Sequence, residues 1–148
     1  MKTTDIQLTE HFSLSEFTRS ATAARFGIDN TPDTGQVTNL RNLCCEILEP
    51  LRREYGPIHI SSGFRTERLN MLVHGVGNSQ HMRGEAADIR IPDKQMGEKY
   101  FQFIRFRCNY DQLIFEHNRW GATWIHVSCK NDIALNRHMA FRTPEKRK

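Results

Sequence analysis

No run of apolar residues in this sequence approaches the length of about 18 that a membrane-spanning helix requires, so no membrane span is expected. Residues 1–5 lack the apolar core typical of a signal peptide, which predicts synthesis in the cytoplasm and release or export by another route. The sequence has only four cysteines, and none forms a CxxC pair. With Cys44 directly before Cys45, the spacing indicates neither a metal-binding pair nor a disulfide framework. All four, which include Cys108 and Cys129, are therefore expected to be buried free thiols.

A strong charge of either sign is missing too. The net charge is +4, and Lys and Arg are dispersed except in the segment 142–148. Basic and aromatic residues do not alternate, and no nucleic-acid-binding motif is present, so binding of nucleic acid by the basic tail has little support. What the chain does have is a 38% hydrophobic content in 148 residues. This predicts one domain, with its core at about 12–130 and a tail at 131–148, and a monomer as the default state.

Hydrophobic periodicity predicts alternating helices and strands. A capping box of Ser13 and Glu16 begins a short helix, and the longest amphipathic pattern runs over 36–55, where Pro50 predicts a kink or an early stop. Strands are expected at 58–61, 86–91, 112–116 and 123–129, with a candidate edge strand at 138–141. Further helices are expected at 66–72 and 94–107. Residues 25–35 and 74–78 are expected to form loops, and residues 1–11 a polar lead-in. Two strands joined by a short turn near the end indicate an antiparallel pair. The expected fold class is α+β, with helices packed on one side of a small, mostly antiparallel sheet.

Strand alternation places three polar residues on one face of that sheet. In the strand at 86–91, Asp88 points away from its apolar neighbours, and His126 does so in the strand at 123–129. Glu116 alternates with apolar residues in the same way, in the strand between them along the chain. Three strands are therefore each expected to direct one ligand-type or proton-transfer residue into a common cleft.

Two histidines and one carboxylate are a donor set that suits zinc. His81 lies just before the strand that carries Asp88, in a segment where Gly84 allows the chain to fold back. With His126 as the third ligand, a zinc ion would keep a fourth position open for water. Each of these residues also fits an ordinary structural role, and the pattern alone leaves both interpretations open. The ligand types also leave other divalent ions open.

Several short motifs together resemble one peptidase family. They are Ser-Gly-Phe-Arg at 62–65, Ser-Gln-His at 79–81, Ala-Ala-Asp at 86–88 and Trp-Ile-His-Val at 124–127. These motifs resemble the zinc D-Ala-D-Ala carboxypeptidases and related phage endolysins, which share a fold with the hedgehog signalling domain. The likeness covers residues 12–130. It implies a hedgehog/DD-peptidase-like fold, one zinc ion as cofactor and peptidoglycan peptides as substrate.

The resemblance also implies roles for individual residues. His81, Asp88 and His126 match the family's three zinc ligands. Arg65 matches an arginine that contacts the substrate and steadies the developing oxyanion, which makes it both a catalytic and a substrate-binding candidate. Without the resemblance, Arg65 is better interpreted as a surface or capping arginine after a turn.

Two further features of the family concern the substrate-binding loop and the catalytic acid and base. Ser79 and Gln80 match the substrate-binding loop beside the first ligand. Many relatives have an acidic residue three positions before the last histidine, His126, but this chain has Thr123 there. The resemblance therefore leaves Glu116 as the candidate catalytic acid and base.

Two functions follow from these interpretations. The first is a zinc-dependent peptidase that hydrolyses peptidoglycan stem peptides, as a D-Ala-D-Ala carboxypeptidase or as an endopeptidase of the endolysin kind. The alternative is a non-catalytic module that contains zinc and binds cell-wall peptide. For the enzyme, the cleaved bond stays open between the terminal D-Ala-D-Ala bond, an L-Ala-D-Glu bond and a cross-bridge.

Overall fold

The computed structural model describes residues 5–143, and its centre is a five-stranded sheet with the spatial order β3-β4-β6-β5-β7. Neighbouring strands pair antiparallel, except that β5 and β7 run parallel. The α+β class and the mostly antiparallel sheet are thus confirmed. The strands are β3 (His59–Ser62), β4 (Ala86–Arg90), β5 (Gln112–His117), β6 (Thr123–Ser128) and β7 (Met139–Arg142), each within one residue of its predicted bounds.

The edge strand β7 extends the sheet into the segment that was expected to be a tail. An ion pair fixes the chain just before it. Asp111 is fully buried, and its carboxylate accepts hydrogen bonds from Arg137 Nη2 at 2.7 Å and from the backbone N–H of Arg137 at 2.9 Å. Because Asp111 directly precedes β5, this contact brings the end of the chain beside that strand. Residues 144–148 of the expected tail lie outside the described part of the chain.

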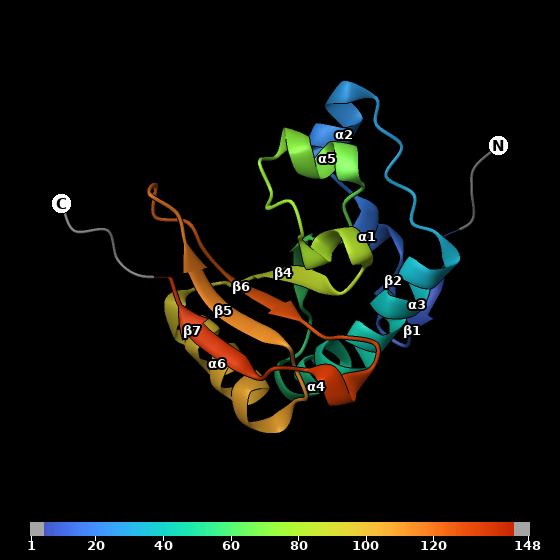
Figure 1. Ribbon diagram of the computed structural model, residues 1–148. Helices are drawn as coiled ribbons and strands as arrows, with labels where there is room; N and C mark the ends of the chain where they lie inside the picture. Colours follow the sequence, from blue (N-terminus) through green and yellow to red (C-terminus); the bar gives the residue numbers. More distant parts are fainter. Residues whose placement is uncertain (1–4, 144–148) are drawn as a thin grey trace.

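Two long helical segments cover one face of the sheet (Figure 1). One is α6 (Lys94–Arg107), which contacts β5, β6 and the end of the other segment. That other segment is continuous through α3 (Thr34–Leu43), η1 (Cys44–Leu48) and α4 (Glu49–Tyr55). Side chains from both helical segments and from the sheet form a single hydrophobic core. No helix among residues 5–143 is long and apolar enough to cross a membrane.

Of the kink or early stop predicted at Pro50, the early stop does not occur. Instead, residues Cys44–Leu48 wind as a π-helical turn directly before the proline, and the helix continues to Tyr55. A proline has no N–H to donate, and its ring collides with the carbonyl group one turn earlier. A wider turn at this point accommodates the proline without ending the helix.

The N-terminal part contains elements that the sequence did not predict. The expected polar lead-in includes β1 (Gln7–Thr9), which pairs with β2 (Phe12–Ser13), whereas residues 1–4 lie outside the described part. The expected helix after Ser13 is α1 (Ser15–Thr18). Half of its capping box forms: the Glu16 carboxylate accepts the Ser13 N–H at 2.7 Å, but no side-chain hydrogen bond at the N-cap position completes it. A short helix, α2 (Ala21–Phe26), begins inside a stretch with no predicted structure and enters the expected loop.

The prediction of four buried thiols is correct for two cysteines and wrong for the others. Cys44 and Cys129 are buried, but Cys45 is exposed and Cys108 is half-buried. Adjacent helical positions point in different directions, so that Cys45 cannot share the core-facing position of Cys44. All four are free thiols, as expected.

Candidate metal centre

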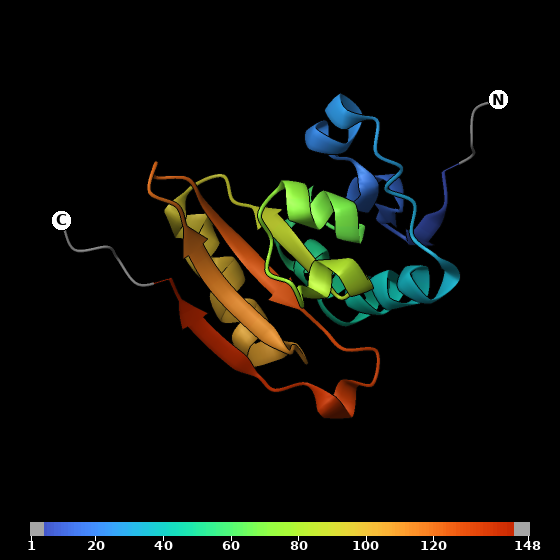
Figure 2. The same ribbon diagram turned by 45° about the horizontal axis from the view of Figure 1, so that its top comes forward.

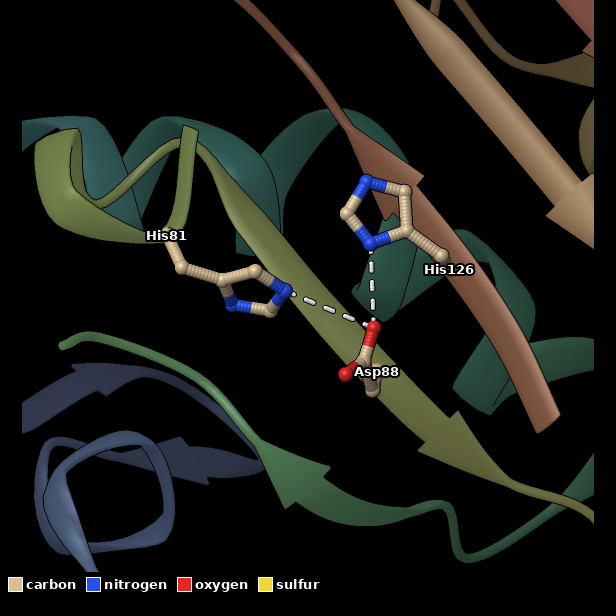
Figure 3. A group of neighbouring side chains, drawn as sticks. All are labelled: His81, Asp88 and His126. Atoms are coloured by element: carbon tan, nitrogen blue, oxygen red, sulfur yellow. Dashed lines mark hydrogen bonds and ion pairs between the residues drawn. The ribbon is translucent and has the colours of Figure 1, made fainter. Parts of the chain in front are cut away.

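Asp88 and His126 lie side by side on the open face of the sheet. They are paired positions in the antiparallel ladder between β4 and β6, while their neighbours Ile89 and Ile125 are fully buried on the other face. Asp88 Oδ1 lies 3.0 Å from His126 Nδ1 (Figure 3). The alternation predicted from the sequence is therefore confirmed for these two residues.

His81 reaches the same point from a turn outside the sheet. It lies in η2 (Gln80–Arg83), a 3-10 turn that ends at Gly84 with a φ of +75°. A Cβ atom at Gly84 would lie 2.5 Å from a backbone oxygen of α3, so that only glycine fits this close approach. The turn directs His81 Nε2 to 3.4 Å from Asp88 Oδ1 (Figure 3).

A backbone carbonyl fixes the orientation of the His81 ring. His81 Nδ1 lies 2.6 Å from the carbonyl oxygen of Gly63, at the end of β3. In a neutral imidazole, Nδ1–H donates to this carbonyl and Nε2 keeps its lone pair, which then points at the cluster. Gly63 is itself confined, because an added Cβ would lie 2.6 Å from the backbone of Phe17.

The donor atoms of His81, Asp88 and His126 all lie within 4.8 Å of one another. Zinc bonds to nitrogen and oxygen ligands are about 2.0–2.2 Å long, so ligand atoms at tetrahedral angles lie roughly 3.3 Å apart. The 3.0 and 3.4 Å separations from Asp88 Oδ1 agree with that spacing. The donor set therefore fits one zinc ion by both its chemistry and its dimensions.

The electrostatics of the cluster keep Asp88 ionised. Burial by itself would raise the pKa of Asp88, but hydrogen bonds and charge from His126 and His81 outweigh it and hold the pKa well below its usual range. The second carboxylate oxygen, Oδ2, lies 3.8 Å from Arg65 Nη2. An anionic carboxylate between two imidazoles is the state that a metal ion requires of its ligands.

The structure also brings Arg65 to the cluster. Arg65 follows β3 and precedes α5 (Glu67–Leu72), and its Nη1 donates to Asn70 Oδ1 at 3.1 Å. Burial lowers the pKa of the Arg65 guanidinium, an effect that the charges of Asp88 and Glu116 oppose, and an arginine remains a cation at neutral pH. Asn70 thus fixes a half-buried positive charge beside the proposed ligands.

Glu116 lies on the open face, one step along the sheet from His126. In the β5–β6 ladder, Ile114 pairs with His126 and Glu116 pairs with Trp124. Trp124 Nε1–H donates to Glu116 Oε2 at 2.8 Å. The predicted face for Glu116 is confirmed. Its bond to Trp124 was not predicted, although the same alternation places Trp124, two residues before His126, on this face.

Ser79 and Gln80 are buried in the turn that carries His81. The Ser79 hydroxyl accepts the backbone N–H of His81 at 3.2 Å, and Gln80 Nε2 donates to Glu85 at 3.3 Å. Both side chains thus support the turn. A contact of either one with substrate stays a prediction.

This constellation defines a class of protein. Two imidazoles and a carboxylate converge on one point, with a half-buried arginine beside them and a glutamate on the next row of the sheet, as in a metallopeptidase centre. The family model described as Peptidase M15 matches residues 10–128, and the chain belongs to that family of zinc D-Ala-D-Ala carboxypeptidases. The match includes every predicted site residue and ends with β6. A search of curated proteins finds no match.

Proposed function

We propose that the protein is a zinc-dependent peptidase that hydrolyses peptidoglycan stem peptides, as a D-Ala-D-Ala carboxypeptidase or as an endopeptidase of the endolysin kind. The observation that carries the proposal is the convergence of His81, Asp88 and His126 within 4.8 Å in a chain of the M15 family. The mostly antiparallel sheet, with its two long helical segments on one face, also supports a hedgehog/DD-peptidase-like fold. A zinc ion held by such ligands lowers the pKa of a bound water to about 7 and polarises a peptide carbonyl.

Glu116 is the proposed acid and base. It accepts a proton from the attacking water and returns it to the amine that leaves. The hydrogen bond from Trp124 holds Oε2, so that Oε1 is free to carry the proton. Glu116 is half-buried on the open face, where both a peptide and water can reach it.

Arg65 is the proposed stabiliser of negative charge on the reacting carbonyl oxygen. Its guanidinium is mostly buried and is held by Asn70, so that little reorganisation is needed as charge develops. Ser79 and Gln80 lie beside the first ligand and are proposed to contact the substrate backbone from there. The protein is proposed to act as a monomer on the peptidoglycan of the cell wall.

The proposal is tested with purified protein and peptidoglycan, incubated with and without a chelator. We expect soluble peptides of defined mass in the presence of zinc, none after chelation, and one zinc ion per chain by metal analysis. His81→Ala is expected to lose both the ion and the cleavage. If no metal binds to the wild-type protein, and His81→Ala and His126→Ala change nothing, the site is wrongly assigned.

One observation favours the alternative of a module that contains zinc and binds cell-wall peptide without cleaving it. Thr123 begins β6 at the position where many relatives carry an acidic residue. Glu116→Gln separates the two functions. If the wild-type protein cleaves and the variant binds zinc equally but does not cleave, the chain is an enzyme that uses Glu116. If the zinc-loaded wild-type protein binds peptide and cleaves none, it is a binding module.

A further inference from the structure

A pocket of about 260 Å³ lies next to the metal cluster, between the first turn of α2, the end of β3 and α5. Figures 1 and 2 show α2 and α5 as neighbours, with α5 on the side of the sheet opposite α6. The polar residues that line the pocket are Arg19, Ser20, Thr22, Ser61, Ser62 and Arg65. Among residues 5–143, no acidic side chain lines it.

The pocket and the metal cluster share a wall. Ser62 is the ladder partner of Asp88. The Ser61 hydroxyl donates to the backbone carbonyl of Asp88 at 3.2 Å, and Arg65 Nη2 lies 3.8 Å from its carboxylate. A peptide with its reacting carbonyl at the cluster therefore has its next residue within reach of the pocket.

The charge of the pocket selects an anion. Arg19 is exposed, and its guanidinium makes no hydrogen bond or ion pair with another described residue of 5–143. Its planar donor pair is free to bind a carboxylate through two parallel hydrogen bonds. On the opposite wall, the Ser62 hydroxyl accepts a hydrogen bond from Arg65 Nε at 3.4 Å and keeps its own O–H as a further donor.

The volume of the pocket limits what can enter. At about 260 Å³ it is smaller than the roughly 300–1,000 Å³ of pockets that hold drug-sized ligands. One small residue with its carboxylate suits this volume better than a longer segment of peptide.

We propose that this pocket binds the free carboxylate of the residue directly after the scissile bond, with Arg19 as its anchor. This inference rests on the proposed peptidase function and names its substrate class. Two residues of stem peptides offer that chemistry: a terminal alanine, through its C-terminal carboxylate, and a γ-linked glutamate, through its free α-carboxylate. A residue whose carboxylate is blocked as an amide loses the contact with Arg19.

The test uses two pairs of synthetic peptides, each pair differing only by carboxylate or carboxamide. One pair ends in D-Ala-D-Ala, and the other carries L-Ala-γ-D-Glu with its α-carboxyl free or amidated. Binding to zinc-loaded Glu116→Gln is measured by calorimetry, and KM and kcat are measured with the zinc-loaded wild-type protein. In the pair that suits the pocket better, we expect the carboxylate peptide to bind about tenfold more tightly than the carboxamide peptide. This difference corresponds to one charged hydrogen-bonded contact that solvent can reach.

Variants of Arg19 show whether this preference comes from the pocket. In Arg19→Ala the preference for the acid is expected to disappear through a higher KM with kcat kept, and Arg19→Lys should retain part of it. Arg25→Ala is the matched control, because Arg25 is an exposed arginine near the end of the adjoining helix α2, where it stacks on Phe26 outside the pocket. It is expected to keep the full preference. The pair that shows the larger preference identifies the source of the carboxylate.

The outcomes separate this inference from the proposed function. If acid and amide bind equally, if neither binds, or if Arg19→Ala keeps the preference, the pocket does not bind a carboxylate, even where cleavage proceeds. If binding depends on the carboxylate and on Arg19 while the wild-type protein cleaves nothing, the pocket binds a carboxylate but the protein is not a peptidase.

Discussion

Asp88 is half-buried and Asp111 is fully buried, and both aspartates have cationic or potentially cationic partners, yet only Asp88 belongs to the candidate site. The pKa of each lies below its usual range, because partner groups outweigh the cost of burial. Asp111 is surrounded by donors alone, from the guanidinium and backbone N–H of Arg137 and from the Lys130 ammonium at 3.9 Å. Asp88 instead meets two imidazoles whose ring nitrogens can themselves bind a metal ion.

The difference shows what distinguishes a metal centre from a structural ion pair. Burial of charge and a shifted pKa occur in both clusters, so neither identifies function by itself. At Asp111, every partner satisfies the carboxylate and fixes the chain before β7. At Asp88, the partners form a convergent set of donors that a cation can bridge. Four predictions test and refine this comparison.

Asp88→Asn is expected to have the largest effect. An amide supplies no anionic ligand, so zinc affinity should fall by more than about 100-fold, because even the outer partners of metal ligands are worth about 10–100-fold. Peptide cleavage should be lost with the metal, while the circular dichroism spectrum of the metal-free protein stays unchanged. Competition with a chromogenic chelator measures the affinity. Tight zinc binding by the variant would remove Asp88 from the ligand set.

Asp111→Asn should show the opposite pattern. Loss of the buried carboxylate leaves the donors of Arg137 with a weaker partner, and we expect the free energy of unfolding to fall by about 1–3 kcal/mol. Zinc affinity per folded molecule should not change, because Asp111 belongs to a separate cluster. Urea unfolding and the chelator competition measure the two quantities. A parallel loss of zinc affinity would mean that the two clusters are coupled.

Trp124→Phe tests a third carboxylate, Glu116, which accepts a hydrogen bond from the neutral indole of Trp124. Phenylalanine keeps a ring on the sheet face but donates no hydrogen bond to Oε2. Loss of one such bond corresponds to about 1 kcal/mol, so kcat should fall roughly fivefold, with zinc affinity kept. An unchanged kcat would show that Glu116 needs no positioning by Trp124.

The sequence predicted the parts of this molecule that depend on local pattern. Period-two alternation sufficed to place Asp88, His126 and Glu116 on one face, because the two faces of a strand differ so strongly in burial. The ion pair between Asp111 and Arg137 could not be predicted, since Arg137 lies 26 residues further along the chain and no local sequence pattern indicates the pairing.

Other features escaped prediction because they depend on tertiary contacts. The Arg19 pocket needs α2 and β3 to meet, and α2 is too short for a clear helical period. The ring orientation of His81 depends on a carbonyl group 18 residues earlier, at Gly63. The zinc ligands were inferred from the family resemblance together with strand alternation. Neither of these predicts the contact with the Gly63 carbonyl or the presence of the pocket.

The smallest expected effect is a change in how stability depends on pH. The pKa of Asp111 is lowered in the folded protein from an ordinary value of 3.8, so that the unfolded chain takes up the proton first as the pH falls. The contribution of Asp111 to stability is therefore complete well above pH 3.8 and is lost as the pH falls through the folded pKa. Urea unfolding of the wild-type protein and Asp111→Asn at a series of pH values should give a difference that shrinks below about pH 4. A difference that stays constant down to pH 2 would show that the carboxylate charge of Asp111 is not what holds the chain before β7.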